Sequence, residues 1–231
     1  MKIKKKTIVN FLKEVHMGEV NKCLLCFEEN GLRINTKSLA STHNAYGFLS
    51  KEQFEEYTKL GNVGIDDLAT LIEIFSRMGE TIDFTIKGNL LIMKGTKMEL
   101  QVPLLDEKFI DEVKEIKNME FETTFSLEVK RIKKFLNDAS NNKNFKIIIE
   151  TVDEGVKIYN TGKFKFTYNE DAENAKKGSI VKFGNPFEKI FKSIEGGNVT
   201  IHMKTHYPMK IEHETEEYKV NFFLAPIIEK E

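Results

Sequence analysis

The chain has 231 residues, of which 40% are hydrophobic and 31% are charged, which is typical of a globular protein with one large domain or two domains of about 115 residues. The 35 Lys and Arg residues nearly balance the 36 Asp and Glu residues, so the net charge neither indicates nor excludes a nucleic-acid partner. No apolar run reaches the roughly 20 residues of a membrane helix, the N-terminus shows no signal-peptide core, and the two cysteines fit a reducing compartment.

The first half predicts two helices among short strands. Ile8, Phe11, Leu12 and Val15 follow the i, i+3, i+4, i+7 spacing of an amphipathic helix, and a second such stripe ends at Gly79. Short β-rich runs separated by turn residues predict the strands. The expected elements are helices at 7–16 and 65–78, strands at 1–6, 23–28, 32–35, 42–49, 53–57, 81–87, 90–94 and 97–104, and a loop at 61–64.

The stretch 105–120 is highly charged and lacks a clean sheet periodicity. It is compatible with a helix or with a long connector, and we favour the connector. It would then join the first half to a second half of similar organisation.

The second half repeats the pattern. Val129, Ile132, Phe135 and Leu136 form the apolar stripe of a helix for which Ser126 is the expected cap. Asn185-Pro186 is a cap-plus-first-turn signal for another helix, with Asn185 as its expected cap, and Gly196-Gly197 ends this helix. The expected elements are helices at 127–139 and 187–194, a polar loop at 169–178, and strands at 121–125, 145–150, 155–160, 163–168, 180–183, 199–204, 209–214 and 218–224.

Each half therefore reads strand, helix, four strands, helix, three strands. Self-similarity at a spacing of about 115 residues indicates a duplicated domain and not a solenoid. Each helix has only one apolar stripe, so the two helices of each half should lie side by side on one face of an antiparallel sheet. The expected class is α+β, with the N-terminal domain at 1–104, the connecting loop at 105–120 and the C-terminal domain at 121–231.

The outward faces of the helices are basic. A solvated lysine face explains any one helix, but several basic helices on the same face favour a surface for phosphate backbones. No exposed aromatic residues are interleaved with the basic ones, so base reading is not implied. The candidate DNA-facing residues are Lys13, Arg77, Lys130, Arg131, Lys133, Lys134, Lys189 and Lys192.

The sequence offers no catalytic constellation, so we expect no enzyme, no cofactor and no metal. Cys23 and Cys26 have metal-like spacing, but residues three apart on a strand point to opposite faces, and no second cysteine pair exists. His202 and His206 are too far apart on a strand region to share a metal ion.

The residues at the end of the chain allow two interpretations. Pro226 should stop the pairing of the last strand, yet Ile227 and Ile228 beyond it are apolar. They are either packed onto the core or part of an exposed apolar patch for a partner.

This ending resembles that of a known family. The aromatic pair Phe222-Phe223 and the sequence Leu224-Ala225-Pro226, followed by Ile227-Ile228-Glu229, are similar to the aromatic pair, Leu-Ala-Pro and acidic tail of the proliferating cell nuclear antigen type of sliding clamp. The region around Pro208 resembles the penultimate strand of that family.

The rest of the chain agrees with the resemblance. Glu128, Arg131 and Lys134 stand where the family has an acid and two arginines. The duplicated two-helix halves and the long connector are also similar, so the resemblance covers nearly the whole chain.

The resemblance implies the DNA clamp fold and a ring of three subunits that encircles duplex DNA, with the helices inside. It implies a processivity factor that binds DNA polymerase, a clamp loader and other replication or repair proteins through peptides with an apolar plug. The implied peptide pocket comprises Leu39, His43, Tyr46, Val113, Ile116, Pro208, Phe223, Leu224, Ala225, Pro226 and Ile227. The implied subunit interface comprises Lys97, Glu99, Gln101, Lys163, Phe164, Lys165, Phe166 and Tyr168.

Some features depart from the family. Glu73 and Ser76 stand where relatives tend to be basic, and the connector lacks a proline that is common there. The short chain suits an archaeal or viral clamp, which would be cytoplasmic and nucleoid-associated; a eukaryotic one would be nuclear. The alternative function is a clamp-like adaptor, or a heterotrimer subunit, that binds peptides without encircling DNA by itself.

Overall fold

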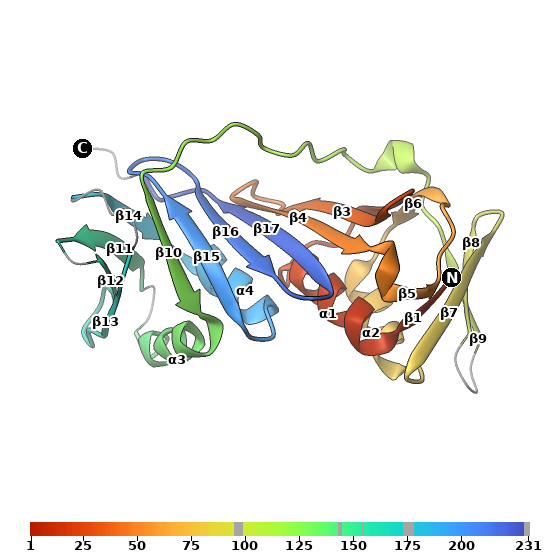
Figure 1. Cartoon of the computed structure of the whole chain (residues 1–231), viewed down its shortest axis with the longest axis horizontal. Helices are drawn as coiled ribbons and strands as arrows, with labels where there is room; N and C mark the ends of the chain where they lie inside the picture. The colour runs from red at the N-terminus through yellow and green to blue at the C-terminus, as the bar shows by residue number, and fades with distance from the viewer. Residues whose placement is uncertain (95–98, 143–144, 154, 173–177, 229–231) are drawn as a thin grey trace. The chain divides into compact units, whose positions relative to one another are not determined.

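The computed structural model describes residues 1–94, 99–142, 145–153, 155–172 and 178–228. The chain forms two compact units (Figure 1). Unit 1 comprises Met1–Leu39, Ala45–Glu115 and Thr215–Val220, and unit 2 comprises Ala40–Asn44, Ile116–Glu214 and Asn221–Glu231. In the described residues, no helix is long and apolar enough to cross a membrane.

Unit 1 contains two helices and two antiparallel arrays of strands. Helices α1 (Lys5–His16) and α2 (Leu68–Arg77) pack against each other, with their apolar stripes buried. One array has the order β4-β3-β2-β6, and the other has the order β5-β1-β7-β8-β9. The strands are β1 (Lys2–Lys4), β2 (Cys23–Glu28), β3 (Gly31–Lys37), β4 (His43–Ser50), β5 (Phe54–Glu56), β6 (Gly61–Ile65), β7 (Thr81–Lys87), β8 (Leu90–Lys94) and β9 (Glu99–Pro103), and the 3-10 turns are η1 (Lys51–Gln53) and η2 (Glu107–Phe109).

Two expectations for unit 1 are wrong. The segment 61–64 is part of strand β6, which pairs with β2 from Gly61 opposite Phe27 to Ile65 opposite Cys23. Helix α2 begins at Leu68 and not at 65, because Asp67 caps it by accepting a hydrogen bond from the Thr70 amide at 2.9 Å. The connector contains the 3-10 turn η2 and no helix of greater length, which agrees with a connector and not with a helix at 105–120.

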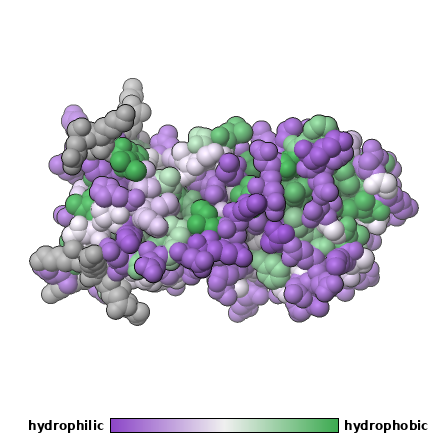
Figure 2. Space-filling model, turned by 90° about the horizontal axis from the view of Figure 1, so that it is seen from above, coloured by the Kyte–Doolittle hydropathy of each residue, from purple (hydrophilic) through white to green (hydrophobic). Residues whose placement is uncertain are grey.

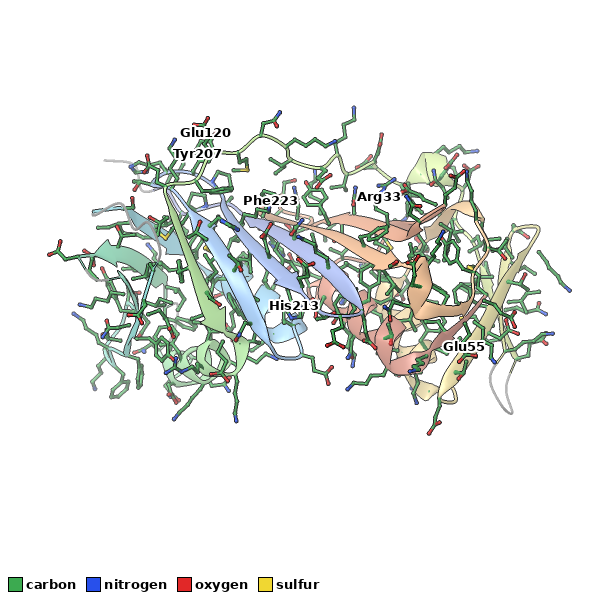
Figure 3. All side chains as sticks on the ribbon, viewed as in Figure 1. Arg33, Glu55, Glu120, Tyr207, His213 and Phe223 are labelled. Atoms are coloured by element: carbon green, nitrogen blue, oxygen red, sulfur yellow. The ribbon has the colours of Figure 1, made fainter. Side chains whose placement is uncertain are left out.

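Unit 2 follows the same plan. Helix α3 (Val129–Ala139) packs against α4 (Asn185–Ser193), and the strand orders are β13-β12-β11-β14 and β10-β15-β16-β17. His213 of β16 points to the turn after α4, where its Nε2 lies 3.0 Å from the Gly196 carbonyl oxygen (Figure 3). The strands are β10 (Thr123–Glu128), β11 (Ile147–Val152), β12 (Gly155–Asn160), β13 (Thr167–Glu170), β14 (Ile180–Phe183), β15 (Asn198–Met203), β16 (Met209–Glu214) and β17 (Tyr218–Leu224), and the first three residues of β17 belong to unit 1.

Both predicted helix caps of the second half are wrong. Ser126 lies inside β10, opposite Thr200 of β15, because that strand continues to Glu128. Asn185 is already the first residue of α4, and Gly184 occupies the cap position. The predicted strand at 163–168 is also wrong in its first half, since β13 begins only at Thr167.

The expected duplication is confirmed by the strand orders. β4-β3-β2-β6 in the first half corresponds to β13-β12-β11-β14 in the second, and β1-β7-β8-β9 corresponds to β10-β15-β16-β17. Each first helix is joined to its unit by the same backbone bond: the Lys5 amide donates to the Glu80 carbonyl, and the Val129 amide donates to the Gly197 carbonyl. The first half differs by carrying the additional strand β5.

Candidate functional site

Helix α3 carries the strongest concentration of exposed cations. Lys130, Arg131 and Lys134 are all exposed. Arg131 is partly neutralised, because its guanidinium lies 3.1 Å from Glu170 Oε1 and 3.7 Å from Glu128 Oε2. Lys130 and Lys134 form no salt bridge within the described part of the chain, so their charges remain available to a phosphate.

Lys133, on the same helix, has a structural role. Its ammonium group donates to the carbonyl oxygens of Ile194 and Glu195, directly beyond the C-terminus of α4. Unit 1 uses the same device, since Lys5 Nζ donates to the Met78 carbonyl at the end of α2 at 3.0 Å. A lysine at this place satisfies a terminal carbonyl and complements the helix dipole.

The other candidate cations differ in how far they are neutralised. Arg77 forms a salt bridge with Glu73, one turn earlier on α2. Lys192 lies 2.6 Å from Glu188 on α4. Lys189 is exposed, as is Lys13, which forms no salt bridge among the described residues. Glu73, one of the departures from the family, therefore pairs with the one arginine of α2.

The two expected interface strands each lie at the edge of an array. β9 is the last strand after β8, and β13 is the last strand after β12. Glu99 and Gln101 of β9 are exposed, whereas Leu100 and Val102 are half-buried on the other face. Tyr168 lies in β13 opposite Ile158, and Lys97 lies outside the described residues.

The residues 163–166 form a fixed loop and not a strand. The Phe164 amide donates to Asn142 Oδ1 at 2.9 Å, and the Phe166 amide donates to Asn160 Oδ1 at 2.7 Å. Both asparagines also donate to the Phe164 carbonyl, each at 2.8 Å. The Phe164 amide and carbonyl and the Phe166 amide are thus bonded to side chains of the same unit, which agrees with the later start of the strand at Thr167.

A pocket of about 330 Å³ opens between this loop, β13 and α3. Its apolar lining comes from Phe135, Phe166 and Tyr168, and Arg131 and Lys134 contribute the basic rim. The Arg131 guanidinium stacks on the Tyr168 ring at 5.1 Å from its centroid.

The members of the implied peptide pocket differ in exposure. His43, Tyr46, Phe223 and Leu224 are buried, so they offer little surface to a partner. The remaining members keep exposed surface; among them Leu39 is 90% exposed and Ile116 is 36% exposed. Figure 2 shows a mostly hydrophilic face on which hydrophobic patches remain visible. The members with exposed surface are Leu39, Val113, Ile116, Pro208, Ala225, Pro226 and Ile227.

The tail after β17 is attached to unit 2 through its backbone. The Ala225 amide donates to the Thr42 carbonyl, and the Ile227 amide donates to the Lys182 carbonyl, both at 2.8 Å. Ile227 is half-buried, but Ile228 is 67% exposed. The tail is therefore attached to the unit by its backbone, and Ile228 beyond it remains exposed; whether this surface binds a partner stays a prediction.

The side chains that hold the connector in unit 1 include Asn35, which sequence reasoning missed, and Tyr46, which it named only as a pocket residue. Asn35 Nδ2 donates to the Val113 carbonyl, and the Tyr46 hydroxyl donates to the Lys114 carbonyl, both at 2.9 Å. An asparagine on a strand gives no sequence signal that it will bind a distant connector.

Cys23 and Cys26 are free, buried thiols. Burial raises the pKa of the Cys23 thiol to about 12 and also raises the pKa of the Cys26 thiol, so both are protonated at neutral pH. No group of three or more potential metal ligands occurs among the described residues.

The duplicated units, each with two helices on antiparallel strands, define a clamp fold. No protein-family model matches the chain, and no curated protein matches its sequence. Among solved structures, it is similar to the A. fulgidus proliferating cell nuclear antigen (PCNA) in a complex described as the C-terminal region of FEN-1 bound to that clamp, with a TM-score of 0.88, 19% identity, and coverage of 100% of this chain and 99% of that chain.

Entamoeba histolytica PCNA is also similar, with a TM-score of 0.84, 18% identity and 98% coverage of both chains. The chain therefore has the PCNA-type clamp fold, and the expected fold class is confirmed. At these identities, the likeness establishes the fold alone.

Proposed function

We propose that this protein is a DNA sliding clamp, a processivity factor that encircles duplex DNA and tethers replication and repair proteins. The observation that carries the proposal is the match of the clamp fold over the full length of the chain. A clamp acts by positioning other proteins, so the chain needs no catalytic group, cofactor or metal. The proposed localisation is that of the DNA it binds. This is the cytoplasmic nucleoid for an archaeal or viral clamp and the nucleus for a eukaryotic one.

Helix α3 supports the DNA-binding part of the proposal. Lys130 and Lys134 are exposed and form no salt bridge with another described residue, so their charges are available to phosphates. Contacts to phosphates are independent of sequence and allow sliding. A closed ring keeps the protein on DNA by topology, so a few such contacts are sufficient.

The edges β9 and β13 support a ring of three copies. A strand edge exposes unpaired backbone groups, which natural proteins cover or pair. In the proposed homotrimer, β9 of one copy pairs with β13 of the next. The apolar pocket formed by Phe135, Phe166 and Tyr168 lies directly at this edge and would receive side chains of the neighbouring copy.

The partner part of the proposal rests on exposed apolar residues of the connector and the tail. Ile116 and Ile227 belong to the surface expected to bind an apolar plug, and the A. fulgidus clamp was solved with the C-terminal region of FEN-1. DNA polymerase, a clamp loader and repair enzymes are the proposed partners.

The second candidate is an adaptor, or a heterotrimer subunit, that binds peptides without encircling DNA by itself. The internal pairing of Arg77 with Glu73 and of Lys192 with Glu188 favours it, because both pairs lower the positive charge of the helices.

Native mass measurement distinguishes the two candidates. A homotrimer of this 26.7 kDa chain has a mass of about 80 kDa, three times that of the monomer. Tyr168→Ala should shift the protein toward monomer, because it removes a ring from the proposed interface pocket. Tyr159→Ala, a matched change on the neighbouring strand β12, should leave the trimer intact. A wild-type protein that stays monomeric at high concentration would contradict the homotrimer.

A further inference from the structure

Strand β10 of unit 2 has one edge with which no described strand pairs (Figure 1). It is the outermost strand of the array β10-β15-β16-β17, and β15 covers its other edge. A pocket of about 380 Å³ lies beside it. We call the open edge and this pocket the β10 edge site, which is lined by Thr124, Phe125, Ser126, Asp171, Ala172 and Thr200.

The lining places the pocket along the edge of the sheet. Thr124, Phe125 and Ser126 are consecutive residues, and consecutive residues of a strand point to opposite faces of the sheet. A pocket confined to one face would meet only alternate residues, whereas this one meets all three. Thr200 of β15 stands opposite Ser126, and the two residues that follow β13 complete the lining.

The open edge presents backbone groups of β10. The Val129 amide donates to the Gly197 carbonyl, in register with the ladder between β10 and β15. Bonded and non-bonded pairs alternate along an antiparallel ladder, so every second residue counted back from Val129 bonds to β15. The N–H and C=O groups of Ser126 and Thr124, which lie between those residues, therefore point to the open edge. Such an edge is a template for another strand.

In unit 1 the equivalent edge is covered by strand β5. Lys2 of β1 corresponds to Ser126 of β10, because each lies three residues before the amide that joins the first helix to its unit. Lys2 pairs with Glu56 of β5 in an antiparallel ladder. The repeat thus shows directly that an edge in this place accepts an antiparallel strand.

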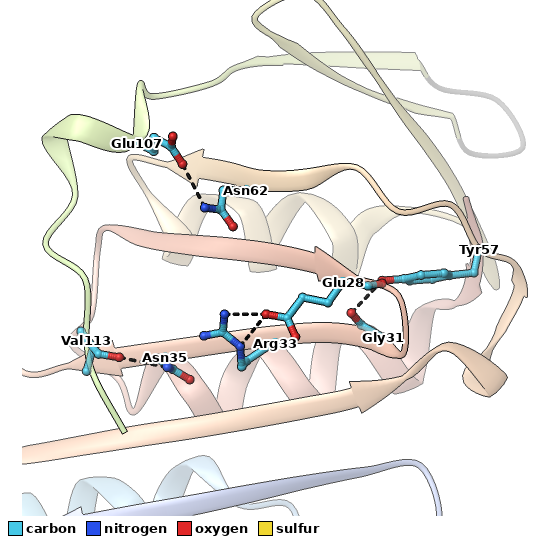
Figure 4. A network of polar contacts seen from close by, with 8 residues as sticks. All are labelled: Glu28, Gly31, Arg33, Asn35, Tyr57, Asn62, Glu107 and Val113. Atoms are coloured by element: carbon cyan, nitrogen blue, oxygen red, sulfur yellow. Dashed lines mark hydrogen bonds and ion pairs between the residues drawn. The ribbon is translucent and has the colours of Figure 1, made fainter. Parts of the chain in front are cut away.

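Side chains help to hold β5 in its place. Phe54 is only 8% exposed, and its ring lies 5.0 Å from that of Tyr57, between centroids. The Tyr57 hydroxyl donates to the Gly31 carbonyl at 2.7 Å (Figure 4). Lys2 of β1 forms a salt bridge with Glu55 at 2.6 Å. A strand in this place is therefore held by a buried aromatic anchor and by charges that complement those of the edge.

The corresponding segment of unit 2 has no such anchor in its sequence. β5 follows β4 in the chain, and β4 corresponds to β13, so the corresponding segment is 171–178. It reads Asp-Ala-Glu-Asn-Ala-Lys-Lys-Gly, with no aromatic, β-branched or other large apolar residue. Aromatic and β-branched residues are the types that favour strands. The sequence therefore favours an anchor supplied by another chain.

The charge at the β10 edge also differs from that at the β1 edge. Where β1 has Lys2, β10 has Ser126, and the carboxylates of Glu128 and Asp171 beside the edge are exposed. Glu128 approaches the guanidinium of Arg131 only to 3.7 Å. Charge complementarity therefore favours an incoming strand with basic residues over an acidic one such as β5.

We propose that the β10 edge site binds an extended segment of a partner protein, which adds to β10 as an antiparallel strand and places a large apolar side chain in the pocket. Basic residues on either side of this anchor would face Glu128 and Asp171. The site shares no residue with the implied plug pocket or the implied subunit interface. It goes beyond the proposed clamp function and does not depend on it.

The test uses a short synthetic peptide in which a central phenylalanine is flanked by alternating threonine and lysine residues. Hydrogen exchange, followed by NMR on the full-length protein, should show rapid exchange of the Thr124 and Ser126 amides in the free protein. With saturating peptide these amides should exchange at least about tenfold more slowly, because the added strand takes up their N–H groups.

Three altered peptides separate the contributions to affinity. Alanine in place of the phenylalanine should weaken binding about thirtyfold, because the apolar anchor is lost. N-methylation of the two backbone nitrogens that face β10 should weaken it about tenfold, because two hydrogen bonds are lost. Glutamate in place of the lysines should weaken it about threefold at low salt and not at high salt.

Two protein variants locate the site. Ser126→Pro removes an N–H group at the open edge without removing a bond to β15, so the fold should persist and the peptide should no longer bind. Asp171→Lys should reverse the preference between the lysine and glutamate peptides. Asp111→Lys, at an exposed carboxylate of unit 1, is the matched control and should leave this preference unchanged.

Four results would each overturn the proposal. They are slow exchange of the Ser126 amide in the free protein, which would mean that the chain's own residues pair with this edge, no binding of the lysine peptide, equal binding of its N-methylated form, and binding that survives Ser126→Pro. If that variant does not fold, the N-methylated peptide decides alone. None of these results bears on the clamp function, which the native mass and retention on DNA test separately.

Discussion

Helices α1 and α3 hold the same place in their units, but only one of them has its second face covered. Their apolar stripes correspond residue by residue: Ile8, Phe11 and Leu12 in α1, and Ile132, Phe135 and Leu136 in α3, are all buried. The neighbouring positions differ, because Thr7, Val9 and Glu14 of α1 stand where α3 has Arg131, Lys133 and Asp138.

The segment Thr215–Val220 explains why α1 carries so little charge on that face. The Tyr218 hydroxyl donates to Glu14 Oε1 at 2.7 Å, and Thr7 Oγ1 donates to Glu217 Oε1 at 2.8 Å. The Tyr218 ring lies 5.5 Å from that of Phe11, between centroids. Thr7 and Glu14 are consequently 2% and 0% exposed.

In α3 the corresponding face is open. Arg131, Phe135 and Asp138 line the pocket beside β13, in the position that Tyr218 fills in unit 1. In the repeat, β17, which begins with Tyr218, corresponds to β9 of the first half. The comparison therefore supports the proposed ring: the strand that should cover α3 is β9 of another copy.

The largest expected effect comes from placing the charge of α3 into α1. Val9 is 6% exposed, so Val9→Lys puts an ammonium group into a buried position, on the side of α1 that in α3 carries Lys133. We expect a loss of about 3 kcal/mol in the free energy of unfolding, measured with urea, because a buried cation lacks hydration. A loss below about 1 kcal/mol would mean that the ammonium group finds acceptors there, as Lys133 does in α3.

A smaller loss is expected from Glu14→Ala. The change removes the Glu14 carboxylate that accepts from the Tyr218 hydroxyl, in a side chain that is 7% exposed, and opens a cavity. The free energy of unfolding should fall by about 2 kcal/mol. Asp138→Ala, at the equivalent place in α3, should change it by less than about 0.5 kcal/mol. Equal losses at the two positions would contradict the difference between the helices.

Lys133→Met tests the structural role of one cation of α3. It should lower the free energy of unfolding by about 1 kcal/mol, because the carbonyl oxygens beyond α4 lose a charged donor. Lys130→Met removes an exposed charge without such a bond and serves as the control. If the two changes have equal effects, Lys133 does not stabilise the end of α4.

The smallest effect should appear in DNA affinity. Lys130→Ala with Lys134→Ala should weaken binding of duplex DNA about fivefold at low salt and lower the slope of log K against log salt by roughly 2. Arg77→Ala with Lys192→Ala should weaken it less, because Glu73 and Glu188 already neutralise those cations. If the Arg77→Ala, Lys192→Ala variant loses more DNA affinity in a salt titration, the proposed difference between free and neutralised cations is wrong.

Most helices and strands were predictable because a covered face imposes a period on the sequence. The stripes around Phe11 and Phe135 identified both first helices within a few residues. Strand β6 was missed because Gly61 and Gly64 read as a loop, although the pairing with β2 and the approach of Leu105 require a strand there.

The parts of the site that were not predictable depend on contacts between distant residues. Nothing local marks Asn142 and Asn160 as the residues that fix the loop at 163–166, or Asn35 and Asn62 as those that fasten the connector. The basic character of α3 was predictable from composition, but the engagement of Lys133 at α4 was not.

The central claim, that this protein encircles DNA, is tested most directly by retention on linear duplex DNA with blocked or open ends. The protein is allowed to thread onto duplexes attached to beads at one end, and the free end is then closed with a bulky protein block. After a high-salt wash, which removes electrostatic contacts, the protein should remain on the blocked DNA and should be released when a restriction enzyme cuts it. Retention that is the same on open and blocked DNA, or that survives cutting, would contradict a ring around the duplex.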